Sequence, residues 1–191
     1  MRTNPARGPA ADPRPLIGEP LPLDLLNTRW IDDGTLHDLL RYPDGLAIWL
    51  HSADLGEQVP ATEETLHALL ATRTALASLV DSGAGGQAAA EDLNETLRHG
   101  RIRRLLDEDG PRSVVETDSP GWLAAWTAAE VYLQLLDENP ERIRKCANPE
   151  CVLHFYDVSK NGGRRWCSMV GCGNRAKAHR HYSRRKQATD G

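Results

Sequence analysis

The sequence predicts an α+β fold: a mostly helical N-terminal domain with short antiparallel strands, then a small C-terminal module of knuckle, β-hairpin and helix. Two observations lead to this prediction. Apolar residues recur at helical spacing through much of the first 140 residues, and turn-rich segments separate these runs. All four cysteines then lie close together, between residues 146 and 172. The length of 191 residues suits one domain with a small appendage.

We expect three segments along the chain. Residues 1–15 contain Arg, Pro and Ala but no apolar run, which indicates a disordered lead-in rather than a secretory signal. Residues 16–140 form the α+β domain, and residues 141–187 form the cysteine-containing module. No apolar run reaches the roughly 18 residues that a membrane span needs. These features predict a cytoplasmic protein that does not enter a membrane.

Five segments carry apolar residues at the spacing of a helix. They are residues 34–42, 43–55, 62–83, 88–100 and 119–140. Asp44 is placed to cap the second segment, and Thr62 is placed to cap the third. The last segment begins with Ser-Pro, a cap followed by proline at the first helical position. Its expected buried face consists of Trp122, Trp126, Ala129, Leu133 and Leu136.

Strands are expected in two places in the N-terminal domain. Residues 15–28 read as two short extended runs around Gly18 and Glu19, and the prolines at 20 and 22 place at least one run at an edge. Residues 101–118 read as two strands joined by a turn at residues 108–111. Residues 82–87 are expected to form a loop.

The net charge of −4 hides a division along the chain. Residues 142–186 hold twelve Lys or Arg against only Glu150 and Asp157, a net charge of +10. Residues 1–141 hold eleven Lys or Arg against twenty-four Asp or Glu, a net charge of −13. This asymmetry predicts a basic segment that meets a polyanion. The alternative is a solvated charged tail without a specific partner.

The cysteines are spaced as two close pairs, Cys146 with Cys151 and Cys167 with Cys172, and fifteen residues separate the pairs. This pattern is typical of a structural zinc site, because a tight turn aims two sulfurs at one ion. Four thiolates leave no open position for water, so one structural Zn²⁺ per chain is expected. Two disulfides or four free buried thiols are the alternatives, and disulfides are disfavoured in the cytoplasm.

The rest of the module is expected to support the metal in a treble-clef-like arrangement. Residues 152–158 and 164–167 would form a hairpin around a turn at residues 161–163. A helix would follow Cys172. The module contains few apolar residues, so its folding should depend on zinc. Loss of the metal should largely spare residues 16–140, because that domain has a core of its own.

The positive charges of the module have two competing uses. Lys145, Arg164, Arg165 and the start of the last helix could compensate the negative charge of the zinc–thiolate unit. Alternatively, the cations could contact nucleic acid, because Lys177, Arg180 and Arg184 share the face of that helix opposite Ala178 and Tyr182. The candidate nucleic-acid-binding residues are Arg164, Arg165, Lys177, Arg180, Arg184 and Arg185.

The tail resembles the CGNR zinc-finger family in the segments RRWCS and CGNRAK, the latter beginning at Cys172. The preceding region is similar to the ABATE domain at LDLLNT (23–28), DLL (38–40) and LAIWL (46–50). The resemblance implies a bacterial transcription regulator, sometimes described as stress-induced, with a DNA-binding finger. It also implies that all four cysteines bind the zinc ion. Asn174 and Arg175 complete the signature. We expect structural roles for both, because Asn174 could cap the start of the helix and Arg175 lies toward its packed side. Direct contact with bases or phosphates is the alternative.

The N-terminal domain also offers a candidate ligand pocket. Polar side chains and an indole gather in one short stretch that consists of Asp24, Asn27, Thr28, Arg29 and Trp30. The alternative is that Asn27 and Thr28 cap the next segment while Trp30 packs in the core. A small-molecule effector is therefore one of the expected partners.

The sequence favours a DNA-binding regulator that is associated with the nucleoid, and a homodimer is one candidate assembly. The chain has no GxGxxG, P-loop, GxSxG or HExxH motif, so an enzyme is not expected. An RNA-binding protein is the first rival, and exposed Phe155 and Tyr156 would favour it by stacking on single strands. A protein-interaction module with a zinc-stabilised basic tail is the second, and a ligand-binding protein that the finger merely stabilises is the third.

Overall fold

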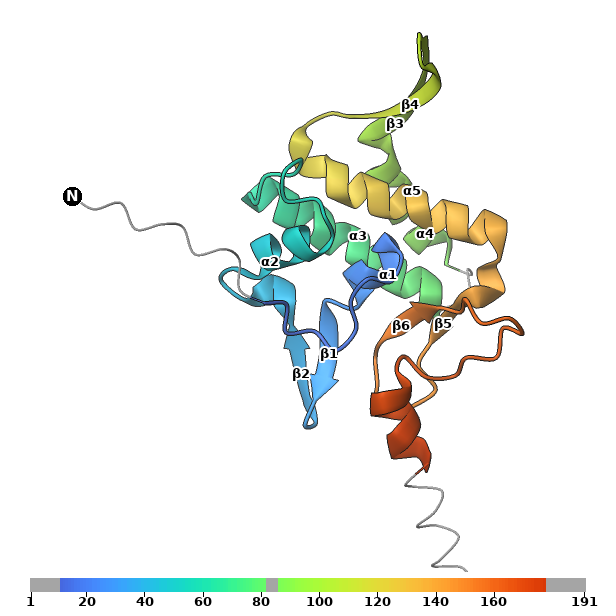
Figure 1. Cartoon of the computed structure of the whole chain (residues 1–191). Helices are drawn as coiled ribbons and strands as arrows, with labels where there is room; N and C mark the ends of the chain where they lie inside the picture. The colour runs from blue at the N-terminus through green and yellow to red at the C-terminus, as the bar shows by residue number, and fades with distance from the viewer. Residues whose placement is uncertain (1–10, 82–85, 178–191) are drawn as a thin grey trace, which may run out of the picture.

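The computed structural model describes residues 11–81 and 86–177 of the chain (Figure 1). Its α-helices are α1 (Leu21–Leu26), α2 (Gly45–Ser52), α3 (Glu63–Asp81), α4 (Gln87–Arg98) and α5 (Leu123–Glu138). Its strands are β1 (Arg29–Asp32), β2 (Thr35–Asp38), β3 (Gly100–Asp107), β4 (Gly110–Thr117), β5 (Ile143–Lys145) and β6 (His154–Tyr156). Short 3-10 turns form η1 (Leu39–Arg41), η2 (Pro120–Trp122) and η3 (Pro140–Arg142), and a π-helical turn forms η4 (Met169–Gly173).

The strands of the described residues form three separate antiparallel pairs, β1 with β2, β3 with β4 and β5 with β6. The α+β class expected from the sequence is confirmed, with helices dominating the N-terminal part. No helix in residues 11–81 or 86–177 is both long and apolar enough to cross a membrane.

The core forms where α1 packs against α3 and α5, which also pack against each other. Leu23 and Leu25 of α1 are fully buried there, together with Leu69 and Leu76 of α3. α5 presents buried alanines to this core, and small side chains allow helices to approach closely. Each buried leucine contributes about 1.5–3 kcal/mol relative to an exposed one. The short helix α1 is thus held by burial rather than by its own helical hydrogen bonds.

The same core continues into the cysteine-containing module. β6 packs on α1, and Phe155 has an exposed fraction of 0 %. Leu153 and three of the cysteines belong to the same buried cluster as α1 and α3. The two parts therefore share one buried cluster, and we now expect loss of the metal to affect residues 16–140 as well, in place of the independent core predicted from the sequence.

The first segment of the domain differs from its prediction. Residues 21–26 form helix α1 instead of an extended run. Pro20 is the N-cap and Pro22 lies in the first turn, where the missing N–H groups of proline would have no helical partner in any case. The lead-in is also shorter than expected, because Arg14 is buried and paired with Asp24. Residues 1–10 lie outside the described residues.

Residues 34–42 form strand β2 and turn η1 rather than a helix. The β1–β2 turn consists of Asp33 and Gly34, both with positive φ, at 44° and 74°. Two positive φ values define the type I′ turn that matches the twist of a hairpin, and Asp-Gly is its usual sequence. Leu39 and Leu40 of η1 are buried, whereas Leu36 of β2 is exposed, and the spacing of these leucines alone does not distinguish this arrangement from a helix.

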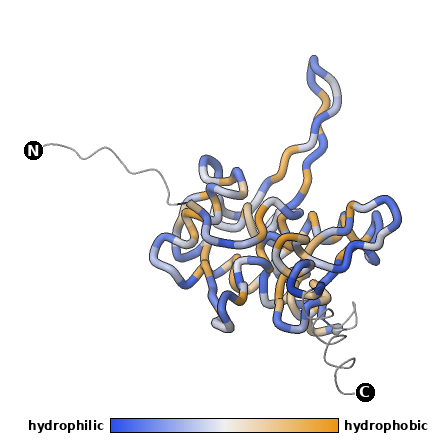
Figure 2. The backbone as a smooth tube through the Cα atoms, turned by 60° about the horizontal axis from the view of Figure 1, so that its bottom comes forward, coloured by the Kyte–Doolittle hydropathy of each residue, from blue (hydrophilic) through white to orange (hydrophobic). Residues whose placement is uncertain are grey.

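The other helices and the β3–β4 hairpin lie where the sequence predicts them. Thr62 accepts a hydrogen bond from the backbone N–H of Thr65 at 3.3 Å, as expected of its capping role in α3. Asp44 is the N-cap residue of α2, but its side chain makes no cap hydrogen bond. The β3–β4 hairpin projects from the body of the molecule (Figure 1 and Figure 2). Residues 82–85 of the expected loop lie outside the described residues.

The buried face of α5 is only partly the expected one. Trp126 and Ala129 are buried, but Leu133 has an exposed fraction of 36 %. Trp122 precedes the helix in η2, so it lies outside the helical register and stacks on His99 instead. The residues that α5 buries are Ala124, Ala125, Trp126, Ala128, Ala129, Tyr132 and Leu135.

Candidate metal centre and nucleic-acid interface

Two knuckles bring the four cysteine sulfurs together. In the first, the backbone N–H of Cys151 donates to the carbonyl of Asn148 at 2.9 Å. In the second, the hydroxyl of Ser168 accepts from the N–H of Gly171 at 3.3 Å, which closes turn η4. A hydrogen bond of 2.8 Å from the N–H of Ala147 to the carbonyl of Arg165 joins the two knuckles. The two knuckles thus place the four cysteines, which form two pairs in the sequence, in one cluster.

The cluster fits a single structural zinc ion. All four Sγ atoms lie within 4.8 Å of one another. The Sγ of Cys167 lies 3.8 Å from that of Cys151 and 3.6 Å from that of Cys172. A tetrahedral Zn²⁺ about 2.3 Å from each sulfur separates the sulfurs by about 3.8 Å. A disulfide needs about 2.05 Å between sulfurs, so the pairing of cysteines as disulfides does not fit this arrangement.

Hydrogen bonds to sulfur surround the cluster. The amide of Asn148 donates to the Sγ of Cys172 at 3.4 Å, and the backbone N–H of Cys167 donates to the Sγ of Cys146 at 3.4 Å. The guanidinium of Arg175 lies 3.7 Å from the Sγ of Cys172. Such donors stabilise thiolates and orient them toward a metal ion. Arg175 therefore contacts a cysteine of the cluster, as expected of a residue with a structural role.

The four thiols cannot all ionise without a cation, because each thiolate would repel the others. Hydrogen bonds from Cys151 and Cys167 lower the pKa of the Cys146 thiol far below its usual range. The same hydrogen bonds with Cys146 raise the pKa of Cys151 to about 12 and raise the pKa of Cys167 as well. A divalent cation is what allows all four sulfurs to bind as thiolates.

The strand pairing within the finger differs from the expected hairpin. Strand β6 pairs with β5, which precedes the first knuckle, and not with residues 164–167. The segment after β6 is instead a loop closed by the buried carboxylate of Asp157, which accepts from the N–H groups of Ser159 and Arg164 at 2.9 Å each. Hydrogen bonding from Ser159 lowers the pKa of Asp157. The single acid between Phe155 and Lys186 thus serves to hold this loop.

Several of the basic residues near the zinc site bind other parts of the protein. The guanidinium of Arg164 donates to the carbonyl of Cys167 at 2.6 Å, pairs with Glu19 at 3.3 Å and lies 4.1 Å from the ring centre of Phe155. The ammonium of Lys145 pairs with Asp81 of α3 at 2.8 Å. Both side chains therefore tie the finger to the N-terminal domain, and Lys145 does not act on the sulfurs as proposed from the sequence.

Four cations of the finger are exposed and have no carboxylate partner among the described residues: Lys160, Arg165, Arg175 and Lys177. Arg165 lies over the ring of Trp166, 5.3 Å from its centre. Arg165, Trp166, Arg175 and Asn148 line a groove of about 390 Å³. The helix expected after Cys172 is described only to Lys177, so Ala178, Arg180, Tyr182, Arg184 and Arg185 lie outside the described residues.

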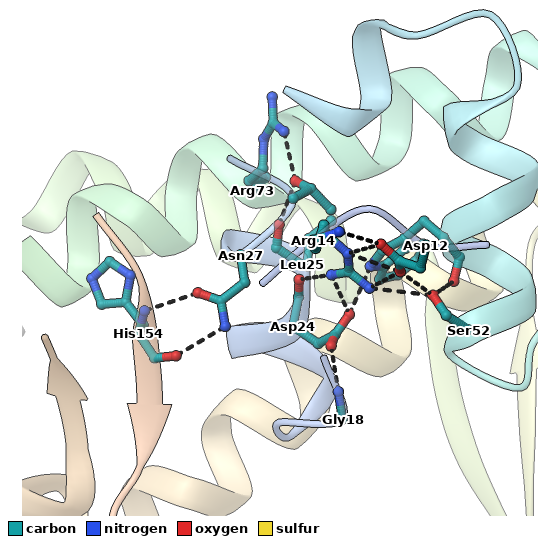
Figure 3. A network of polar contacts seen from close by, with 11 residues as sticks. Asp12, Arg14, Gly18, Asp24, Leu25, Asn27, Ser52, Arg73 and His154 are labelled. Carbon is teal, nitrogen blue, oxygen red and sulfur yellow. Dashed lines mark hydrogen bonds and ion pairs between the residues drawn. The ribbon is translucent and has the colours of Figure 1, made fainter. Parts of the chain in front are cut away.

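The polar residues Asp24, Asn27 and Thr28 of the expected ligand pocket are buried, and their side chains bond to other parts of the protein. The Asp24 carboxylate is buried and accepts from Arg14 at 2.7 Å and from the N–H of Gly18 at 2.9 Å (Figure 3). It also accepts from the indole N–H of Trp49 at 2.9 Å. Thr28 donates to the carbonyl of Leu25 and accepts from Arg73. These contacts anchor the ends of α1, and they leave no group of Asp24 or Thr28 directed at a ligand.

The other three residues of the expected ligand pocket, Asn27, Arg29 and Trp30, lie in three different environments. Trp30 is buried and stacks on His37, with 5.1 Å between ring centres. Arg29 is exposed and lines two adjoining hollows of about 660 and 390 Å³. Asn27 is fully buried and contacts the finger. Only Arg29 of the five expected residues is therefore placed to meet a small molecule.

The Asn27 side chain joins α1 to β6. Its amide nitrogen donates to the carbonyl of His154 at 2.9 Å, and its amide oxygen accepts from the N–H of His154 at 2.8 Å (Figure 3). The two residues are 127 positions apart in the chain. Asn27 thus takes the place of a neighbouring strand, because its side chain satisfies both the N–H and the carbonyl group of His154.

We expect Asn27→Ala to lower the free energy of unfolding by roughly 2–4 kcal/mol, because two buried backbone groups lose their only partner. Asn27→Asp is the matched variant, since its carboxylate retains the acceptor but meets the His154 carbonyl with another oxygen. It should be nearly as destabilising as alanine. Chemical denaturation checks both, and a change below about 0.5 kcal/mol for Asn27→Ala would show that water replaces the amide without cost.

Comparison with protein families assigns both parts of the chain. Residues 142–185 match the CGNR zinc finger. Residues 19–139 match the ABATE family, which is described as "Putative stress-induced transcription regulator". No match was found among curated proteins. The chain therefore belongs to the ABATE family and carries the CGNR zinc finger after its ABATE domain.

Proposed function

We propose that this protein is a bacterial DNA-binding transcription regulator that acts in the cytoplasm at the nucleoid. Its zinc finger contacts the phosphates of duplex DNA, and its N-terminal domain responds to a small effector. Its role is one of binding rather than catalysis. The family matches support a regulator with a zinc finger, and the surface of the finger supports nucleic acid as its partner.

The proposal rests on exposed cations of the finger that have no carboxylate partner among the described residues. Arg101 and Arg103 of the β3–β4 hairpin pair with Glu116, and Lys145 pairs with Asp81. In contrast, the exposed Arg165 and Lys177 of the finger have no such partner in the described part of the chain. Unpaired cations on one surface attract a polyanion, and phosphate contacts supply most of the affinity for nucleic acid.

Single-stranded RNA is the second candidate ligand. The protein surface on which RNA bases were expected to stack is not available, because Phe155 is fully buried and Tyr156 is half-buried. A different aromatic residue, Trp166, lines the groove beside Arg165 and Arg175. An indole flanked by guanidinium groups suits base stacking, so this groove is the feature that favours RNA. Trp166 is itself half-buried, and we therefore favour duplex DNA.

Binding of the zinc-loaded chain to duplex DNA, single-stranded RNA and heparin should separate these candidates. A regulator should bind one DNA sequence more tightly than random duplex, by a factor of at least about 10³ at fixed salt. Immunoprecipitation of bound DNA across a bacterial genome would supply that sequence. Equal affinity for heparin and every duplex would indicate a general polyanion-binding surface, and preference for RNA with loss of binding in Trp166→Ala would favour the second candidate.

A further inference from the structure

A cavity of about 390 Å³ lies where the β1–β2 hairpin, α3 and the finger meet. The hairpin contributes Arg29 and Leu36, α3 contributes Asp81, and the finger contributes Lys145, Val152 and His154. We call it the junction cavity. Its volume is within the usual range for small-molecule sites, which often form between the parts of a protein. A ligand in it would contact both family-defined parts of the chain at once.

His154 is the unusual residue in this cavity. Its backbone binds Asn27, but its ring points away from Asn27 (Figure 3), and neither ring nitrogen has a hydrogen-bond partner among residues 11–81 and 86–177. The residue is only 6 % exposed. Buried polar atoms are paired in the great majority of cases, and an unpaired one usually has a reason. The described part of the chain thus gives this imidazole no hydrogen bond that an apolar ring would lack.

The protonation state of His154 defines what it can bind. Burial, and to a smaller extent the nearby positive charge of Lys145, lower the pKa of this imidazole to about 4. The ring is therefore neutral at physiological pH, with one nitrogen that donates and one that accepts. A neutral imidazole suits a hydrogen bond to a ligand oxygen and carries no charge of its own.

The charge around the cavity indicates an anionic ligand. Arg73 forms a two-point ion pair with Asp38 at 2.7 and 2.8 Å, and Lys145 pairs with Asp81. Arg29 has no carboxylate partner in the described residues, which leaves one positive charge in excess. A guanidinium binds a carboxylate through two parallel hydrogen bonds. The excess charge thus matches one carboxylate.

The walls of the cavity indicate that the rest of the ligand is apolar. Its lining includes the apolar side chains of Leu26, Ile31, Leu36, Ala77 and Val152. Apolar walls with a few placed polar groups are typical of sites for small organic molecules. Inorganic anions would leave these walls in contact with water, so an ion such as phosphate fits the cavity poorly.

We propose that the junction cavity binds a small amphipathic carboxylic acid. Its carboxylate pairs with Arg29, its apolar body lies against Leu36 and Val152, and a ligand oxygen hydrogen-bonds to His154. The site lies beside, not within, the polar cluster around Asp24. The inference rests on the effector role proposed above and gives it a place and a ligand class. A ligand that contacts both the ABATE domain and β6 would couple the two, and linkage makes that coupling reciprocal.

The test uses 1-naphthoate as the probe on the zinc-loaded full chain, without DNA. Isothermal titration should show saturable binding of one naphthoate per chain. The neutral analogue 1-naphthalenemethanol and inorganic phosphate should each bind at least roughly tenfold more weakly, because each lacks one half of the required chemistry. Failure of naphthoate to bind at millimolar concentration would overturn the proposal. Because no DNA is present, this result is independent of whether the finger binds nucleic acid.

Two variants identify the site. Arg29→Gln should weaken naphthoate binding roughly 10- to 100-fold, as expected for loss of a charge-assisted pair. Arg98→Gln, at an exposed arginine of α4, is the matched control and should leave the affinity unchanged. Unchanged affinity in Arg29→Gln would show that the probe binds elsewhere and would overturn the assignment.

His154→Phe distinguishes a binding role from a packing role. Phenylalanine keeps the size of the ring and removes both nitrogens, so it should weaken naphthoate binding about tenfold while the melting temperature stays the same or rises. If this variant fails to fold, ¹⁵N shifts of the His154 ring in the unmodified protein provide the second measurement. Naphthoate should move them, and a ring whose shifts do not respond at saturation would contradict the proposal.

Discussion

Replacing Cys167 with serine should unfold the whole described fold, and not the finger alone. Zinc contributes apparent binding free energies of about 10–16 kcal/mol in isolated finger peptides. The total stability of a domain is only about 5–15 kcal/mol. Because Phe155, Leu153 and the cysteines share one buried cluster with α1 and α3, loss of the metal removes support from both parts. The variant should therefore bind no zinc and lose its cooperative thermal transition.

The measurement that decides is amide hydrogen exchange in α3, which lies outside the finger. Amides in the middle of this helix should lose most of their protection in Cys167→Ser and in chelator-treated protein. Val170→Ser is the matched control, because Val170 lies between two ligands and is 84 % exposed. It should retain one zinc per chain and the protection of α3. Full protection of α3 in Cys167→Ser would show that the ABATE domain folds without the finger.

The metal site could be predicted from the sequence because the pattern that identifies it lies within short stretches of the chain. Two pairs of cysteines at short spacing are sufficient to indicate four ligands, and the structure brings all four together. The strand partner of β6 could not be predicted in the same way. β5 lies before the first cysteine, whereas the turn-like Asn-Gly-Gly after β6 favours a pairing with residues that follow it. The buried Asp157 closes that segment as a loop instead.

The role of the polar residues of α1 depends on contacts that are distant in the sequence. Asp24 and Asn27 look like ligand-binding groups when only their neighbours are considered. Their actual partners are Trp49 and Arg14 for Asp24, and the backbone of His154 for Asn27. Nothing in the local pattern identifies such partners. The sequence therefore indicates that these polar residues have a specific role, but only the tertiary structure shows that the role is to join α1 to its surroundings.

Removing two finger cations should reduce the salt dependence of DNA binding by a calculable amount. Each phosphate contact with duplex DNA contributes about 0.9 to the slope of log affinity against log salt. If Arg165 and Lys177 each contact one phosphate, Arg165→Ala combined with Lys177→Ala should flatten that slope by about 1.8. Affinity for all sequences should fall together, because phosphates carry no base identity. Fluorescence anisotropy at several salt concentrations measures the slope.

The zinc site should tolerate this double substitution. Arg165 joins the knuckles through its backbone carbonyl, which alanine retains, and Lys177 forms no hydrogen bond with a cysteine among the described residues. Arg101→Ala with Arg103→Ala is the control, since it removes the same charge from cations that pair with Glu116 on the projecting hairpin. The control should leave the slope near its original value. An equally flattened salt slope in both double variants would mean that DNA binding depends on the net charge of the protein. A flatter slope in the Arg165 and Lys177 variant alone would place the phosphate contacts on the finger.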